Sequence, residues 1–311
     1  MHPNLKKLSN SAEVLAEACP RLYELDRLSP RENRDDGDVH LDFGTVVGSL
    51  VQDYLSTGNK EYAVWRAFLS YPRTMFAEAI EADEEEKRYK KDFWYALHAL
   101  DKFMVLRRDD YHMYEVAIFD GKPAIELGFI IDCPGGFQYR GKLDAFLITK
   151  EGSFATLEVK TTGARHIHEA MFRHSGQGIG YSAVVDAIVS KLGLQKRESW
   201  PVLYPVYQTL QKEWTPLSFR KSKSSLANWI RHLLRTIQHI SEYAEDNYFP
   251  MHGQNCFRYN KACRFFEQCE MSNKYIVGPE DKIVVKKDKE EDYSFRFSLD
   301  ELIDAQLEKQ Q

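Results

Sequence analysis

Two acids and a lysine lie close together in the sequence, on what we predict to be two neighbouring strands. Asp144 ends the run Gly-Lys-Leu-Asp, and Glu158 and Lys160 belong to the run Leu-Glu-Val-Lys-Thr-Thr. Side chains two residues apart on a strand point to the same face, so we expect Glu158 and Lys160 to share one face. If residues 150–152 form a three-residue loop, Asp144 lies directly opposite Glu158 in an antiparallel pair. The two carboxylates then converge on one cation.

This combination of groups suits the metal-assisted cleavage of a phosphodiester. Hard divalent cations bind carboxylate oxygens and keep several waters, so a phosphate oxygen can enter the coordination shell and a bound water becomes more acidic. A Glu-x-Lys by itself is a weak motif, and its alternative interpretation is a half-exposed strand with a surface ion pair. The prediction of a site therefore depends on the residues that accompany it.

A glutamine and a tyrosine follow with the i, i+4 spacing of one helix face. With them, the chain carries an ordered set on a strand, a strand and a helix: Asp144, Glu158, Lys160, Gln177 and Tyr181. This set resembles the PD-(D/E)xK nuclease superfamily, in particular its RecB-like branch, over residues 115–189. The resemblance implies that Asp144 and Glu158 hold Mg²⁺ or Mn²⁺ and that Lys160 positions or helps to deprotonate the attacking water. It also implies that Gln177 and Tyr181 orient the core or contact DNA.

Two further positions bear on the metal site. Glu126 alternates with apolar residues on the strand expected before that of Asp144. It resembles an additional acid that some RecB-like nucleases add to the metal shell, and its alternative is an outward-facing strand carboxylate. The family often has Gly-x-x-x-His in an amino-terminal helix, but here Gly48-Ser-Leu-Val-Gln52 places glutamine at that position. An amide is a weaker ligand than imidazole, so this difference bears on metal affinity.

Four of the five cysteines could form one metal site. Cys256, Cys263 and Cys269 lie close together near the carboxyl end, and Cys19 lies near the amino end. The start of the chain carries no secretory signal pattern and the cysteine count is odd, so we expect free thiols in a reducing compartment rather than disulfides. Spacing alone does not separate a zinc ion from an iron–sulfur cluster. Cys133 lies in an apolar run, and we expect it to be a buried small side chain.

The Cys-Pro-Arg-x-Tyr context of Cys19 resembles RecB-like nucleases of the AddB and CRISPR-adaptation types. These carry one cysteine before the nuclease core and three after it, which together hold a [4Fe-4S] cluster. The resemblance implies such a cluster on Cys19, Cys256, Cys263 and Cys269, with Zn²⁺ or unligated thiols as the alternatives. The six-residue gap between Cys256 and Cys263 is wider than the commoner family spacing.

The hydrophobic pattern predicts an α/β protein, and the resemblance implies a restriction-endonuclease-like core in which helices flank a mixed central sheet. We expect a helical amino-terminal region over residues 1–110 that contributes Cys19, and a nuclease core over 111–245. A Cys-rich, cluster-binding loop over 246–275 and a charged tail over 276–311 complete the predicted organisation. Within that tail, residues 295–307 could form a short helix, but we expect them to be frayed.

Composition fits a soluble, cytoplasmic protein. No apolar run approaches the roughly 20 residues of a membrane span, so we expect no membrane association. The net charge of −5 argues against indiscriminate coating of nucleic acid, with acid concentrated at 81–86 and from residue 280 onward. A local basic groove in such a protein can still bind DNA.

These features predict metal-assisted cleavage of a phosphodiester, and the resemblance implies a Mg²⁺- or Mn²⁺-dependent DNA nuclease. The resemblance further implies an exonuclease that acts in phage or bacterial recombination, repair or DNA processing, with a helicase or recombination protein as a potential partner. The competing hypothesis is a DNA-binding or scaffolding subunit that keeps the fold and the cluster but has little or no turnover. Intact Asp144, Glu158 and Lys160 argue against that hypothesis, and Gln52 argues weakly for it.

Overall fold

The computed structural model describes residues 2, 4–28, 39–70, 91–194, 200–258, 261–266, 269 and 294–307. The chain divides into two compact units. The first unit comprises residues 1–34, 128–141 and 224–304, and the second comprises residues 35–127, 142–223 and 305–311. The acidic stretch at 81–86 and the charged stretch at 281–292 lie outside the described residues.

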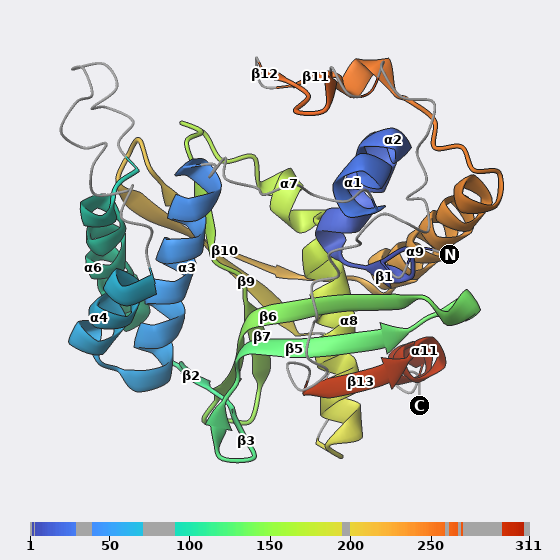
Figure 1. The fold of residues 1–311 in the computed structure, drawn as a ribbon. Helices are drawn as coiled ribbons and strands as arrows, with labels where there is room; N and C mark the ends of the chain where they lie inside the picture. The colour runs from blue at the N-terminus through green and yellow to red at the C-terminus, as the bar shows by residue number, and fades with distance from the viewer. Residues whose placement is uncertain are drawn as a thin grey trace. The chain divides into compact units, whose positions relative to one another are not determined.

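The second unit contains a mixed sheet with helices packed on it (Figure 1). Its helices are α3 (Val39–Thr57), α4 (Lys60–Ser70), α6 (Phe93–Asp109), α7 (Glu169–Arg173) and α8 (Gly176–Lys191). Its own strands are β2 (Tyr114–Val116), β3 (Ile118–Phe119), β4 (Lys122–Pro123), β7 (Phe154–Leu157), β8 (Lys160–Thr162), β9 (Pro201–Gln208) and β10 (Glu213–Arg220). It shares β5 (Ile125–Asp132) and β6 (Gln138–Thr149) with the first unit.

Strand pairing in the second unit combines both directions. The order is β10-β9-β7-β6, with β8 paired to β9 and β2 paired to β6. β9 pairs in parallel with β7 and β8 and antiparallel with β10, while β6 and β7 are antiparallel. The predicted α/β class, with a mixed central sheet flanked by helices, is therefore confirmed.

Every residue of β9 is buried, as expected for a strand covered on both faces. Leu203 and Tyr207 belong to a core that also contains the apolar residues of α3, α4 and α6, which lie together in Figure 1. The intervening Tyr204 and Val206 belong to a separate cluster, against which Phe172 of α7 packs. Period-two alternation thus gives each face of the strand its own apolar partners.

The hairpin between β6 and β7 has the register predicted from the loop length. Ala145 pairs with Leu157, and a backbone hydrogen bond between the residues flanking 150–152 closes a three-residue loop. Continuing this pairing by one residue places Asp144 opposite Glu158. The hairpin is thus the local structure that brings the two acids together.

The first unit is built from short elements and one long helix. These are β1 (Lys7–Leu8), α1 (Asn10–Ala18), α2 (Pro20–Tyr23), the π-helical turn η1 (Glu24–Leu28), the 3₁₀ turns η3 (Pro134–Gly136) and η4 (Gly253–Asn255), α9 (Lys223–Glu245), β11 (Phe257–Arg258), β12 (Lys261–Ala262), β13 (Phe295–Ser298) and α11 (Leu299–Leu307). α9 begins and α11 ends within the second unit's residues. The Ser9 side chain accepts a hydrogen bond from the Ala12 N–H and so caps α1.

The expectation that residues 295–307 are frayed is wrong. They form β13 and α11, and β13 pairs in parallel with β5. Phe297 and Leu302 are buried, so apolar burial outweighs the charge of the preceding stretch. α9 buries one apolar face, and no helix among the described residues is long and apolar enough to cross a membrane.

Candidate active site

The predicted strand that carries Glu158 and Lys160 is divided at Glu158 and Val159 into β7 and β8. β7 and β8 pair with β9 in one continuous register. The interruption therefore does not shift Glu158 and Lys160 relative to one another along β9. The interruption lies on the β6 side, where an Asp144 carboxylate oxygen accepts a hydrogen bond of 2.8 Å from the Val159 N–H. A side-chain oxygen therefore takes the place of a backbone acceptor, and Asp144 is fixed beside Glu158.

Glu158, Lys160 and Gln177 form a closed triangle of hydrogen bonds. Lys160 Nζ donates to Glu158 Oε1 over 2.7 Å and to Gln177 Oε1 over 2.9 Å. The Gln177 Nε2 donates to the same Glu158 Oε1 over 2.7 Å. Each member is thus held by the other two, and the amide of Gln177 orients both charged groups.

Tyr181 anchors this triangle to the sheet. Its hydroxyl accepts a hydrogen bond of 2.9 Å from Gln177 Nε2 and donates one of 2.6 Å to the Lys142 carbonyl on β6. Ser175 caps the start of α8, so Gln177 lies in its first turn and Tyr181 one turn later on the same face. Tyr181 is buried. Of the two implied roles, this geometry favours orienting the core over contacting DNA.

The two central acids lie in a setting that disfavours their charged forms. Burial raises the pKa of Asp144 well above its usual range, and Glu158 and Glu126 raise it further while the Val159 N–H and Lys160 oppose the change. Burial also raises the pKa of Glu158, against which Lys160 and Gln177 act. Glu158 Oε2 is buried and has no hydrogen-bond partner. An unpartnered carboxylate oxygen beside a second acid is a suitable position for a cation.

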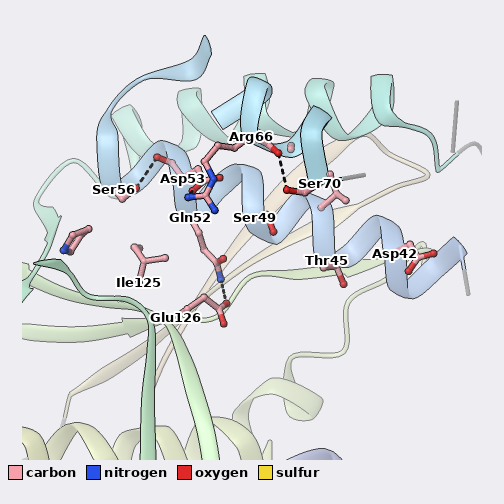
Figure 2. A pocket seen from close by; sticks show the side chains of 13 residues that line it. Asp42, Thr45, Ser49, Gln52, Asp53, Ser56, Arg66, Ser70, Ile125 and Glu126 are labelled. Atoms are coloured by element: carbon pink, nitrogen blue, oxygen red, sulfur yellow. Dashed lines mark hydrogen bonds and ion pairs between the residues drawn. The ribbon is translucent and has the colours of Figure 1, made fainter. Parts of the chain in front are cut away.

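Glu126 approaches the site from the start of β5. Its charge acts on both Asp144 and Glu158, and its carboxylate accepts a hydrogen bond of 2.6 Å from Gln52 Nε2 on α3 (Figure 2). Glu126 has a φ of 49°, in the left-handed region that non-glycine residues rarely adopt. The structure thus brings Gln52 to Glu126, where it acts as a donor to a candidate ligand.

A cavity of about 720 Å³ opens beside Glu126. α3 and α4 line it together with Pro123, Ile125 and Glu126. Its walls carry Asp42, Asp53 and Arg66 (Figure 2). Arg66 pairs with Asp53 over 3.4 Å. Sequence reasoning did not find these lining residues, because no local pattern links positions on separate helices.

The three predicted metal-binding acids interact but do not form a compact trio. Among the described residues, the one group of three or more His, Cys, Asp or Glu ligand atoms within 4.8 Å of one another lies in the first unit and does not include them. Asp144, Glu158 and Glu126 are thus close enough to shift pKa values without meeting at that distance. Asp144 and Glu158 fit a divalent cation by their oxygen donors and by the unpartnered Oε2.

The four cysteines predicted to act together all lie in the first unit. The Cys19 sulfur accepts a hydrogen bond of 3.4 Å from the His252 N–H, and the Cys263 N–H donates to the Cys256 carbonyl over 2.7 Å. Burial raises the pKa of Cys269, Arg21 lowers it, and the thiols of Cys19 and Cys256 raise it.

Cys133 is a separate buried thiol, as expected, and donates to the Ile131 carbonyl.

Comparison with known proteins shows the family of the chain. Residues 7–270 match the family model described as the PD-(D/E)XK nuclease superfamily, and the chain belongs to that superfamily. The crystal structure of a proposed exonuclease from Eubacterium rectale is similar at 15% identity and a TM-score of 0.49, covering 89% of this chain and 92% of that one. The structure of SSO0001 is similar at 12% identity and a TM-score of 0.26, covering 73% of this chain and 85% of that one. No curated protein sequence matched the chain significantly.

Proposed function

We propose that this nuclease-superfamily member is a Mg²⁺- or Mn²⁺-dependent DNA nuclease whose active site is built on Asp144, Glu158 and Lys160. The observation that carries the proposal is the hydrogen bonding of the two Glu158 carboxylate oxygens. Lys160 and Gln177 hold one of its oxygens, and the other is buried without a partner next to Asp144. Such an arrangement suits a metal ligand better than a structural ion pair, which would satisfy both oxygens.

Each residue then has a defined task. Asp144 and Glu158 would hold the divalent cation, with Glu126 as a further acid; the cation supplies Lewis acidity toward the phosphate and acidifies water. Lys160 places a positive charge beside these acids, where it orients the attacking water and offsets charge that develops on the phosphate. Gln177 keeps Lys160 and Glu158 in register, and Tyr181 secures Gln177 to β6.

We further propose that the enzyme is an exonuclease of DNA recombination, repair or processing in a bacterial or phage-infected cell. In this proposal it acts in the cytoplasm, with DNA as its substrate and a helicase or recombination protein as a candidate partner. The cavity beside Glu126 supports an end-directed activity, since its size suits a nucleotide at the end of a strand.

We also propose that Cys19, Cys256, Cys263 and Cys269 hold a [4Fe-4S] cluster. The hydrogen bond from the His252 N–H to Cys19 and the mutual influence of the thiols on Cys269 support a shared site. Among the described residues, no three of these thiols come within 4.8 Å of one another, so the choice of this cluster over a Zn²⁺ site rests on the sequence resemblance and not on the thiol spacing.

The test of the nuclease proposal uses end-labelled linear DNA and circular DNA, each with and without Mn²⁺. Degradation of linear DNA from its ends only when Mn²⁺ is present is the expected result. Cleavage of the circle as well would keep the nuclease and overturn the exonuclease. DNA binding that metal leaves unchanged, without cleavage in Mn²⁺ or Mg²⁺, would establish the scaffolding alternative.

A further inference from the structure

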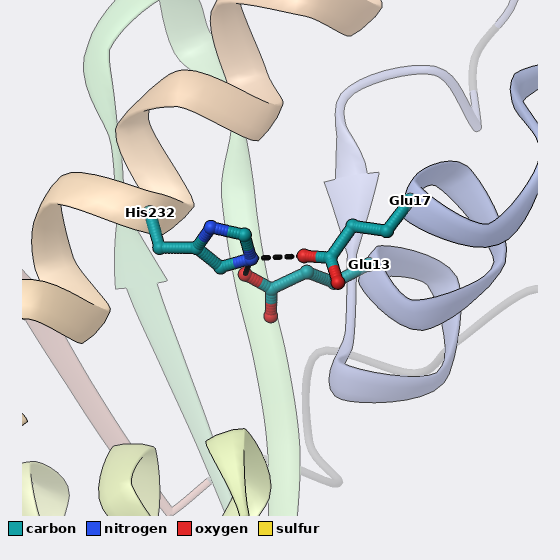
Figure 3. A group of neighbouring side chains, drawn as sticks. All are labelled: Glu13, Glu17 and His232. Atoms are coloured by element: carbon teal, nitrogen blue, oxygen red, sulfur yellow. Dashed lines mark hydrogen bonds and ion pairs between the residues drawn. The ribbon is translucent and has the colours of Figure 1, made fainter.

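A second group of candidate metal ligands lies in the first unit. Glu13 and Glu17 are one helical turn apart on α1, so their side chains share a face, and His232 approaches them from α9 (Figure 3). Glu13 Oε1 lies 3.8 Å from His232 Nε2, which also contacts Glu17 Oε1. One ligand atom from each residue lies within 4.8 Å of the other two. The nuclease proposal uses none of these residues.

The decisive member is Glu13. Its side chain is only 5% exposed, and its Oε1, which faces the group, is buried without a hydrogen-bond partner. Burial raises the pKa of Glu13 to about 7, and Glu17 adds to the shift while His232 opposes it. A buried carboxylate oxygen directed at an imidazole and a second carboxylate, with no donor of its own, is stabilised either by a proton or by a cation at that position.

When both glutamates are ionised, His232 alone does not balance their charge. A protonated imidazole carries one positive charge against two carboxylates, and it can donate only one proton from Nε2. A dication balances both carboxylates and accepts the Nε2 lone pair. The donor set of one imidazole nitrogen and two carboxylate oxygens suits transition-metal dications better than Mg²⁺ or Ca²⁺, which favour oxygen ligands.

We propose that Glu13, Glu17 and His232 bind one transition-metal dication, Zn²⁺ more tightly than Mn²⁺, and that this ion clamps α1 to α9. The order of the two metals follows the general trend of affinity for divalent ions. Since Glu17 and His232 are 215 residues apart in the chain, the site cannot exist in the unfolded chain, and metal binding should stabilise the fold. This proposal is independent of nuclease activity.

The experiment must separate this site from the acids of the second unit and from the thiols. We would therefore use the full chain carrying Asp144→Asn and Glu158→Gln, treated with a mild chelator and titrated with Co²⁺. Carboxylate and imidazole ligands give weak visible bands, whereas thiolates add an intense charge-transfer band in the near ultraviolet. Zn²⁺ and Mn²⁺ titrations, followed by thermal unfolding, complete the measurement.

His232→Asn and Glu17→Gln change exposed side chains, so both variants should fold. We expect each to lose one bound equivalent, or to bind it at least about tenfold more weakly, and to lose the metal-induced rise in the unfolding temperature. His239 is an exposed histidine on the same helix, and His239→Asn is the matched control. This variant should keep the bound metal equivalent and the metal-induced rise in the unfolding temperature. Equal binding by His232→Asn and the parent protein would overturn the proposal. The proposal would also be overturned if the parent protein bound no metal ion through carboxylate and imidazole ligands, because Glu13, Glu17 and His232 would then form only an ion pair.

Discussion

The side-chain amide of Gln52 donates a 2.6 Å hydrogen bond to the carboxylate of Glu126, across 74 residues of sequence. This bond holds a residue whose backbone is in the left-handed region, with a φ of 49°. A donor to a metal ligand usually fixes the ligand's orientation and affects metal affinity. In the proposed active site, the glutamine that departs from the family pattern would therefore act through Glu126.

Gln52→Ala should raise the Mn²⁺ concentration needed for half-maximal cleavage by roughly tenfold, since Glu126 loses its orienting donor. Gln52→His should lower it if the side chain at this position faces the metal, because imidazole is a better metal ligand than an amide. A Mn²⁺ titration of DNA cleavage measures both effects. Ser49→Ala, which changes the same cavity wall, serves as the control. Unchanged titrations in both Gln52 variants would remove Glu126 and Gln52 from the metal site.

Lys160→Ala and Asp144→Ala should each reduce DNA cleavage by a factor of order 10² or more and leave DNA binding largely intact. Each removes charge stabilisation at the reacting phosphate but little of the phosphate-contact energy. Single-turnover cleavage and a binding assay separate the two quantities. Lys150→Ala, an exposed lysine in the β6–β7 loop, should behave as wild type. Cleavage at the wild-type rate by either active-site variant would refute the assignment.

The local parts of the site were predictable from the sequence because strand period, loop length and helix spacing fix them. A three-residue loop sets Asp144 opposite Glu158, and the i, i+4 spacing places Gln177 and Tyr181 on one face of α8. Whether Tyr181 points inward or toward DNA depends on the Lys142 carbonyl, which no sequence pattern marks.

Contacts between residues that are far apart in the sequence could not be predicted. The bond between Gln52 and Glu126 depends on how α3 packs and on an uncommon backbone conformation. The approach of His232 to Glu13 joins helices more than two hundred residues apart. The frayed end expected at 295–307 was wrong for a related reason, since β13 gains its partner from β5.

Gly178→Ala should destabilise the protein by roughly 1–3 kcal/mol, the usual cost of overpacking. A β-carbon at this position would lie 1.7 Å from the Tyr204 hydroxyl, and the Tyr204 ring is buried edge-on against Phe172. Displacement of α8 would also move Gln177 and lower activity. Gly48→Ala in α3 is the matched control, because its β-carbon would meet nothing within 4 Å. That change should be neutral or stabilising by up to about 1 kcal/mol. Equal denaturation midpoints for the two variants would contradict the packing argument.

The stability of the protein should depend on pH through Lys221. Burial, aided by Arg173, lowers the pKa of this lysine to about 8, and its Nζ donates to the Phe172 and Arg173 carbonyls. Between pH 8 and the ordinary lysine pKa near 10.5, the unfolded chain binds a proton that the folded chain has lost. The free energy of unfolding therefore rises with pH across this window.

Lys221→Met removes this dependence. Relative to the variant, the wild type should gain on the order of 2 kcal/mol between pH 7.5 and pH 10, as measured by denaturant titration. Tyrosines that titrate in the same range are common to both proteins and cancel in the comparison. Lys223→Met, at an exposed position nearby, should follow the wild type. A constant difference between wild type and Lys221→Met across this range would show that the amine stays charged in the folded protein.

Replacing any of Cys19, Cys256, Cys263 or Cys269 by serine should give a colourless protein that is unstable or insoluble. The ligands come from both ends of the chain, so the free energy of cluster binding becomes free energy of folding. Anaerobically purified wild type should be brown and contain about four irons per chain. Cys133→Ala is the matched control, because among the described residues that buried thiol hydrogen-bonds to backbone groups and not to the other cysteines, and the variant should keep its iron. One zinc per chain without iron would show that these cysteines form a zinc site and not an iron–sulfur cluster. A Cys263→Ser variant that is stable without metal would exclude both the cluster and the zinc site.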